Sequence, residues 1–150
     1  MNKIFLTWHH VYDHVQTIID QMTQIQWKPH MIVGVTRGGL IPAVILSHYF
    51  DCQMDSINIS LRDHNTHNDA NVHKINNWAI IGYPVLIVDD INDSGATIHT
   101  IMKTITHKQN VKIATLVNNQ GSTTTVDFFG MNINKQVDPS WIVFPWEKED

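Results

Sequence analysis

The chain has 150 residues, 43% of them hydrophobic and 16% charged, which suits one globular domain and excludes a disordered or fibrous protein. A formal net charge of −4 at pH 7 argues against a nucleic-acid partner, because phosphate backbones attract basic surfaces. No apolar run approaches the roughly 20 residues of a membrane span, and the first residues lack a signal-peptide core, so we expect a cytoplasmic protein without a membrane partner.

The first half of the chain predicts alternating helices and strands. Thr7 can cap a helix, and "MIVGV" at 31–35 predicts a short buried strand that leads through a polar turn into a helix at 40–50. The stripe of apolar residues at helical spacing in the first helix comprises Trp8, Val11, Val15, Ile18, Ile19 and Met22. "MDSINIS" at 54–60 alternates as a strand does, whereas residues 61–77 are polar without a clear period and predict a loop.

The second half is organised around one strong strand. "VLIVDD" at 85–90 is apolar on both faces, which is typical of a central strand, and a helix is predicted at 95–107. Two more strands are predicted at 111–117 and 125–129, before an aromatic, apolar tail at 141–147. Strands that alternate with helices indicate one α/β domain with a mainly parallel central sheet flanked by helices.

Two acids end the central strand, and a loop of small residues follows them. Ligands of parallel α/β sheets bind beyond the carboxyl ends of the strands, where Asp89 and Asp90 stand. In the next loop, free backbone amides at a helix start favour an anion, here a phosphate monoester. The residues predicted to hold this phosphate are Asp93, Ser94, Gly95, Ala96 and Thr97. Carboxylates accept hydrogen bonds from sugar hydroxyls and can hold Mg²⁺, so the pattern indicates a ribose 5-phosphate site.

A second polar turn also follows a buried strand and opens a helix. It consists of Thr36, Arg37, Gly38 and Gly39. An arginine fork beside exposed glycine amides suits a more highly charged phosphate group, which predicts a ribose phosphate that carries a diphosphate. Neither a G-x-x-x-x-G-K-[ST] nor a G-x-G-x-x-G pattern is present. Taken singly, the acids could simply end a strand and the small residues could simply begin a helix.

Four stretches resemble one family in order and spacing. "VLIVDDINDSGAT" resembles the signature of the type I phosphoribosyltransferases, and "VTRGGLIPA" resembles their pyrophosphate loop. "TWHHVYDHV" and "WIVFPWE" resemble the xanthine-guanine branch. The resemblance covers nearly the whole chain and implies one phosphoribosyltransferase domain over residues 1–150. It also implies the family's fold, with a small hood at 61–77 and a tail.

The resemblance implies a reaction and residue roles. A purine nitrogen attacks the anomeric carbon of phosphoribosyl pyrophosphate, pyrophosphate leaves, and a nucleoside monophosphate forms. Asp89 and Asp90 would hold the ribose hydroxyls and Mg²⁺, with Asp90 the main metal contact, and Asp93 would accept the proton of ring nitrogen 7. Arg37 and the turn around it would stabilise the leaving pyrophosphate, with a non-proline cis peptide expected at Thr36–Arg37.

The base site departs from the family's pattern. The resemblance implies that the purine stacks on Trp141 and contacts Ile142, although a lone tryptophan is more often core filling. The branch's lysine for the 6-oxo group falls on Asn118 or Asn119, which both donate and accept hydrogen bonds. The prediction is a Mg²⁺-dependent purine salvage transferase for guanine, xanthine or hypoxanthine, in a dimer or tetramer. The alternatives are a regulatory protein that binds phosphoribosyl pyrophosphate without catalysis, and a transferase for adenine or another base.

Overall fold

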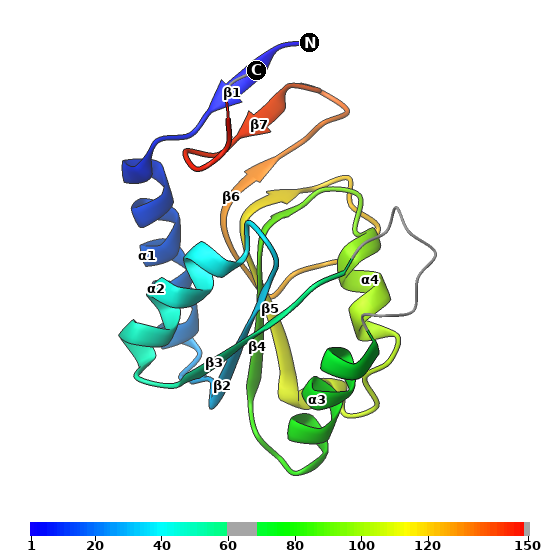
Figure 1. Ribbon diagram of the computed structural model, residues 1–150. Coiled ribbons are helices and arrows are strands. Elements are labelled where there is room, and N and C mark those ends of the chain that lie inside the picture. The colour runs from blue at the N-terminus through cyan, green and yellow to red at the C-terminus, as the bar shows by residue number, and fades with distance from the viewer. Residues whose placement is uncertain (60–68, 149–150) are drawn as a thin grey trace.

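The computed structural model describes residues 1–59 and 69–148, which form a five-stranded parallel sheet covered by helices (Figure 1). The strand order is β3-β2-β4-β5-β6, and every neighbouring pair is parallel. The elements are β1 Lys3–Phe5, α1 Trp8–Gln24, β2 Met31–Val35, α2 Leu40–Phe50, β3 Gln53–Ile57, α3 Asp69–Ile80, β4 Val85–Asn92, α4 Ala96–Met102, a 3₁₀ turn Lys108–Asn110, β5 Val111–Asn119, β6 Phe128–Ile133 and β7 Trp141–Val143. This architecture confirms the predicted α/β class.

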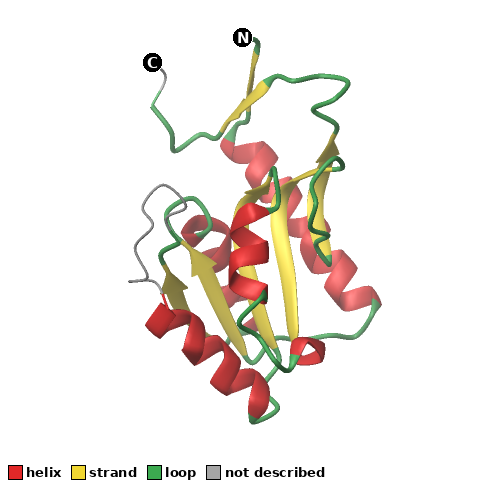
Figure 2. Cartoon of the chain, turned by 90° about the vertical axis from the view of Figure 1, so that its right-hand side faces the viewer, coloured by secondary structure: helices red, strands yellow, loops and turns green. Residues whose placement is uncertain are grey.

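Helices lie on both faces of the sheet, and each face has its own apolar core (Figures 1 and 2). Helices α1 and α2 pack on one face and α3 and α4 on the other. The β4 run "VLIV" is buried between the two layers, which explains why these four positions are all apolar. The central strand therefore brings the acids that follow it to a fixed place at the edge of a rigid sheet.

Helix α1 begins where its sequence predicts. Thr7 caps it, because the Thr7 hydroxyl accepts a hydrogen bond from the His10 backbone N–H at 3.2 Å, and the His10 ring accepts one in return from the Thr7 N–H at 2.9 Å. The predicted apolar stripe is buried from Val11 to Met22. Trp8 is the exception, with 45% of its surface exposed, because it packs against Trp146 of the tail rather than on the sheet.

The predicted loop at 61–77 is wrong over its second half, where helix α3 begins at Asp69. Val72, Ile75 and Ala79 lie one helical turn apart and are buried against the sheet. The many polar residues around them obscure this short stripe. Residues 61–68 of the predicted hood lie outside the described residues.

Several other elements differ in extent from their predictions. Helix α4 ends at Met102, short of the predicted 107, and β6 runs over Phe128–Ile133 instead of 125–129. Two threonines just before the predicted strand contact the 93–97 loop: the Thr123 N–H and hydroxyl both donate to the Ser94 carbonyl, and the Thr124 hydroxyl donates to the Gly95 carbonyl. Residues with high strand propensity therefore brace a loop here.

A small two-stranded sheet joins the two ends of the chain. Strand β1 pairs in parallel with β7, with Lys3 opposite Trp141. Figure 1 places this sheet beyond one end of the central sheet, with both termini beside it. Within the described residues, no helix combines the length and the hydropathy needed to cross a membrane.

Candidate functional site

The two acids at the end of β4 lie partly buried and hydrogen-bonded to the backbone beside them. Asp89 Oδ1 accepts a hydrogen bond from the Asp90 N–H, and Asp90 Oδ1 accepts one from the Ile91 N–H, both at 2.8 Å. Burial raises the pKa of Asp89 well above its ordinary value, and the charge of Asp90 raises it further. Burial also raises the pKa of Asp90, to which the charge of Glu147 adds. Burial and nearby negative charge therefore both disfavour the ionised form of each carboxyl.

Asp90 is the shared wall of three cavities. One, of about 210 Å³, runs along the phosphate loop from Asp89 to Ile98. The second, of about 700 Å³, lies on the side of Arg37 and Gly38. The third, of about 60 Å³, lies against Trp141 and Ile142. Three adjoining compartments around one carboxylate suit a ligand with three chemically different parts.

The first cavity is the predicted phosphate cradle. Asp93, Ser94, Gly95, Ala96 and Thr97 all line it. Gly95 has φ of +93°, and a Cβ there would lie 2.6 Å from the Ser122 hydroxyl and 2.8 Å from the Thr124 N. The Ser94 and Gly95 carbonyls accept hydrogen bonds from the 123–124 segment, which braces the loop. The structure thus brings the predicted phosphate ligands together in one pocket.

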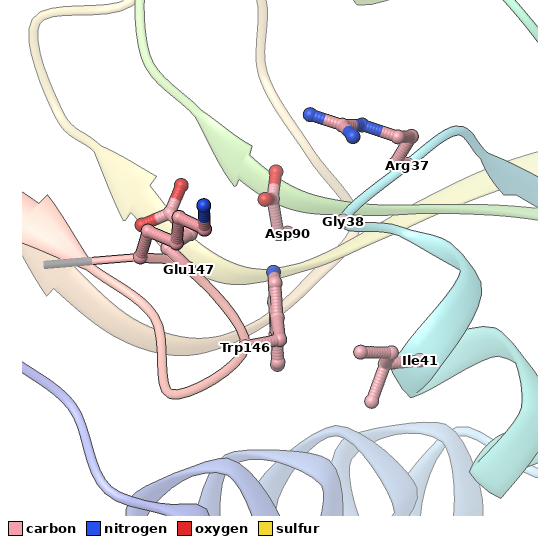
Figure 3. Close-up of a pocket in the computed structure, with 7 residues that line it drawn as sticks. Arg37, Gly38, Ile41, Asp90, Trp146 and Glu147 are labelled. Carbon is pink, nitrogen blue, oxygen red and sulfur yellow. The ribbon is translucent and has the colours of Figure 1, made fainter.

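The second cavity is lined by Arg37 and Gly38 of the predicted pyrophosphate turn, whereas Thr36 and Gly39 do not line it (Figure 3). The peptide between Thr36 and Arg37 is cis, as expected. A Cβ on Gly38 would overlap the Asp90 carboxylate, so only glycine lets the turn approach that acid so closely. In Figure 3 the Arg37 guanidinium and the Asp90 carboxylate lie at the same cavity, with Trp146 and Glu147 across from them.

Sequence reasoning missed the far wall of this cavity. Ile41, Trp146, Glu147 and Lys148 line it. Trp146 also stacks on Phe144, with ring centroids 4.9 Å apart, so it both packs within the tail and lines the cavity. The Glu147 carboxylate accepts a hydrogen bond from the Phe144 N–H at 2.8 Å, which fixes the turn of the tail. The one sequence signal for these cavity residues is that "PWE" closely follows the last strand, β7.

The third cavity is lined by three predicted base contacts and by one lysine that was not predicted. Trp141 and Ile142 from β7 meet Asp93 there, as expected for a base site. Lys135 Nζ lies 2.9 Å from Asp93 Oδ2 and 5.1 Å from the centre of the Trp141 ring. The Lys135 side chain is 20% exposed, so this ion pair is partly shielded from water. No sequence pattern indicated that a residue 42 positions after Asp93 would reach it.

Asn118 and Asn119 do not line this cavity. Asn118 is the middle of a ladder across three strands: it accepts a hydrogen bond from Asn92 Nδ2 at 2.9 Å and donates one to Asn132 Oδ1 at 3.0 Å. Asn119 donates to the Asp93 carbonyl at 3.1 Å and accepts from the Lys135 N–H at 3.2 Å. Both side chains therefore connect backbone and strands, and their predicted contact with a base stays a prediction.

The acid pair fits a magnesium ion that arrives with its ligand. Mg²⁺ prefers a few carboxylate oxygens completed by water and substrate phosphates, rather than a cage made only of protein groups. Asp89 and Asp90 provide two partly buried carboxylates with raised pKa, next to the cavities predicted for phosphates. In the described part of the chain, no cluster of three or more histidine, cysteine or acidic side chains could hold a metal alone.

We expect Asp89→Asn to raise the melting temperature at neutral pH. A carboxyl whose pKa is raised in the folded state binds its proton more tightly there than in the unfolded chain. Stability is therefore lost as the pH rises from the ordinary aspartate pKa through the raised one, and it stays lost above that value. The neutral amide avoids this loss and still accepts from the Asp90 N–H.

Thermal melts at pH 8 and pH 5 measure this effect, with Asp20→Asn, an exposed carboxyl on α1, as the matched control. The gain of Asp89→Asn should be larger at pH 8 than at pH 5, and the control should show no such difference. An Asp89→Asn variant less stable than the wild type at pH 8 would show that the acid pair is not under electrostatic strain.

Comparisons with known proteins agree with this geometry. The family model described as "Phosphoribosyl transferase domain" matches residues 1–149. A xanthine-guanine phosphoribosyltransferase of Cereibacter sphaeroides is 30% identical over 119 residues, which are 77% of this chain and 68% of that protein. The crystal structure of a purine phosphoribosyltransferase from Pyrococcus horikoshii aligns with a TM-score of 0.73 at 28% identity, covering 100% of this chain and 97% of that one. A xanthine-guanine-hypoxanthine phosphoribosyltransferase of Helicobacter pylori shares the fold, with a TM-score of 0.69 at 20% identity over 97% of this chain and 92% of that one.

Proposed function

The chain belongs to the phosphoribosyltransferase family, and from that premise we propose that it transfers ribose 5-phosphate from phosphoribosyl pyrophosphate to guanine, xanthine or hypoxanthine. The products are a nucleoside monophosphate and pyrophosphate, and the role is purine salvage. The observation that carries the proposal is that Asp90 lines three adjoining cavities. One is the phosphate cradle, the second is a wide polar cavity with an arginine, and the third has an aromatic wall.

Each cavity takes one part of the substrates. The loop at 93–97 holds the 5-phosphate with backbone amides and the Ser94 and Thr97 hydroxyls. Asp89 and Asp90 accept hydrogen bonds from the ribose hydroxyls. Arg37 and the amides of the 36–39 turn face the diphosphate, whose charge increases as it leaves. Magnesium, held by Asp90 with Asp89, supplies further positive charge there when bound.

Asp93 is the catalytic residue in this proposal. It stands at the junction of the phosphate loop and the cavity beside Trp141, so one residue touches both the sugar side and the base side. A carboxylate there accepts the proton of ring nitrogen 7 as the base attacks the anomeric carbon. Trp141, with 49% of its surface exposed, offers a ring on which a base can stack once the Lys135 ammonium above it moves aside.

One observation favours a second candidate. The third cavity measures only about 60 Å³ with Asp93 paired to Lys135, which is too small for a two-ring base as it stands. A regulatory protein that binds phosphoribosyl pyrophosphate without catalysis would need the other two cavities and not this one. A transferase for adenine or another base would need this cavity open but with different polar contacts.

A panel of bases separates these functions. We expect pyrophosphate release from phosphoribosyl pyrophosphate and Mg²⁺ with guanine, xanthine or hypoxanthine, and none when a chelator removes the metal. The measurement is a coupled pyrophosphate assay that includes adenine and a reaction without base. Tight binding of phosphoribosyl pyrophosphate without turnover on any base would contradict catalysis and favour the regulatory protein. Turnover on adenine alone would contradict the assignment of 6-oxopurines.

We also propose a cytoplasmic homo-oligomer, a dimer or a tetramer. Large apolar side chains are exposed on several elements, among them Tyr12 and Tyr49, which is consistent with surfaces that pair between copies. Light scattering of the purified protein gives the oligomeric state directly, and a monomer at the concentrations of the activity assay would refute this part.

A further inference from the structure

We propose that Lys135 is the residue that selects a 6-oxopurine, by donating a hydrogen bond to the 6-oxo group, and that its ion pair with Asp93 closes the base cavity until a base enters. The inference rests on the proposed function and deepens it, since it names the chemistry by which this site chooses its base. It differs from the expectation drawn from the sequence, in which Asn118 or Asn119 occupies that role.

The first support is the position of the ammonium group. Lys135 Nζ lies 2.9 Å from Asp93 Oδ2, the proposed proton acceptor, and 5.1 Å from the centre of the Trp141 ring, the proposed stacking platform. The ammonium lies over the Trp141 ring, so a base that stacks on that face moves the ammonium aside, to the edge of the base that lies against Asp93. Among the described residues that line the cavity, Lys135 is the only cation.

The second support is the role that Asn119 has instead of a base contact. Its side-chain oxygen accepts hydrogen bonds from the Lys135 N–H at 3.2 Å and the Gly121 N–H at 3.3 Å. Its side-chain nitrogen donates to the Asp93 carbonyl at 3.1 Å. One amide thus ties together the backbones of the two residues of the ion pair. Asn119 therefore fixes the backbone from which the Lys135 side chain extends, and the Lys135 ammonium makes the contact with the base.

The third support is chemical complementarity. An ammonium group only donates, so it pairs with the oxo group of guanine, xanthine or hypoxanthine and leaves the amino group of adenine without an acceptor. A site with a partly buried hydrogen-bond donor discriminates strongly against a base that offers no acceptor, because the donor then stays unpaired. The asparagines could not discriminate in this way, since an amide can turn to present either its donor or its acceptor.

The ion pair also explains the small cavity. With Lys135 bound to Asp93, the space beside Trp141 is about 60 Å³, and the Asp93 carboxylate is engaged. When a 6-oxopurine enters, its oxo group replaces Asp93 as the partner of the ammonium, and Asp93 becomes free to accept the proton of ring nitrogen 7. Adenine offers no such exchange, so the pair stays closed against it.

The test is Lys135→Met, which keeps the length and apolar stem of the side chain and removes its charge. We expect kcat/KM for guanine or hypoxanthine to fall about 10- to 100-fold, the effect of losing one hydrogen bond to a charged group, while the value for adenine is unchanged or higher. Calorimetry should show the same split in binding: weaker for guanosine monophosphate and unchanged for adenosine monophosphate.

The matched control is Lys112→Met. Lys112 also lies over a tryptophan ring, 5.8 Å from the centre of Trp27, but it is near the amino end of β5, away from the three cavities. This variant should keep both activities within about twofold of the wild type, as surface substitutions usually do. It separates loss of a lysine–tryptophan contact in general from loss of the ammonium at the site.

The outcomes separate this inference from the proposed function. Equal losses for both kinds of nucleotide in Lys135→Met, or no loss for either, would overturn the role of Lys135 while the wild-type activity stands. A wild type that neither turns over any base nor binds either nucleotide would overturn the proposed function, and the inference with it.

Discussion

Replacing Asp93 with asparagine should lower kcat about 10²- to 10⁴-fold, the range in which a positioned general base contributes. The amide keeps the shape of the side chain and cannot accept a proton at neutral pH. The backbone of the 93–97 loop is unchanged, so the 5-phosphate cradle stays intact. The measurement is steady-state turnover with guanine or hypoxanthine, together with direct titration of phosphoribosyl pyrophosphate.

The control for this prediction comes from the ion pair itself. Asp93→Asn and Lys135→Met both remove the same pair, so any loss due merely to the broken pair should be shared by the two variants. Only Asp93→Asn should lower kcat for every base that the enzyme accepts. If binding of phosphoribosyl pyrophosphate collapses in Asp93→Asn as far as turnover does, Asp93 holds the substrate and is not the proton acceptor.

Gly38→Ala should lower kcat/KM for phosphoribosyl pyrophosphate on the order of 10²-fold, since displacing a site by about 1 Å has effects of that size. A Cβ at this position overlaps the Asp90 carboxylate, whose other oxygen is held by the Ile91 N–H. Either the carboxylate or the turn must then move, and both border the cavity proposed for the diphosphate and the metal. Titration of phosphoribosyl pyrophosphate with Mg²⁺, alongside the activity assay, measures the effect.

Gly121→Ala is the matched control, because a Cβ there meets its nearest neighbour at an ordinary 3.7 Å. It should leave both binding and melting temperature close to the wild type. A Gly38→Ala variant with unchanged kcat/KM would show that the close approach of the turn to Asp90 has no part in binding.

Many of the strands and helices can be predicted from the sequence, because their local patterns favour a single type of element. The run 85–90 is apolar on both faces, and the helix at 40–50 was predicted with its observed bounds, because a polar turn and a change of period mark its start. Helix α3 was missed, although Val72, Ile75 and Ala79 are spaced one turn apart. Three apolar residues among so many polar ones give a weak signal, and only the sheet beneath them makes the helix stable.

The candidate site also has one part that the sequence predicts and one part that it does not. The phosphate loop and the glycine turn were predictable, because each is continuous in sequence and its function depends on backbone amides and small residues. The base side was less predictable, because its walls come from separate segments: Asp93 follows β4, Lys135 follows β6, and Trp141 begins β7. No spacing rule connects such residues. The asparagines at 118 and 119 occupy the expected position in sequence and hydrogen-bond to neighbouring strands and backbone, and their contact with a base stays a prediction.

The central claim is that the three cavities around Asp90 form one site for a ribose phosphate, its diphosphate and a purine. A crystal structure with guanosine monophosphate, pyrophosphate and Mg²⁺ tests it most directly. We predict the phosphate on the 93–97 loop, the ribose hydroxyls at Asp89 and Asp90, the pyrophosphate beside Arg37, and the purine on Trp141. Well-ordered density with the 93–97 pocket empty, or with the nucleotide bound elsewhere on the protein, would contradict the account.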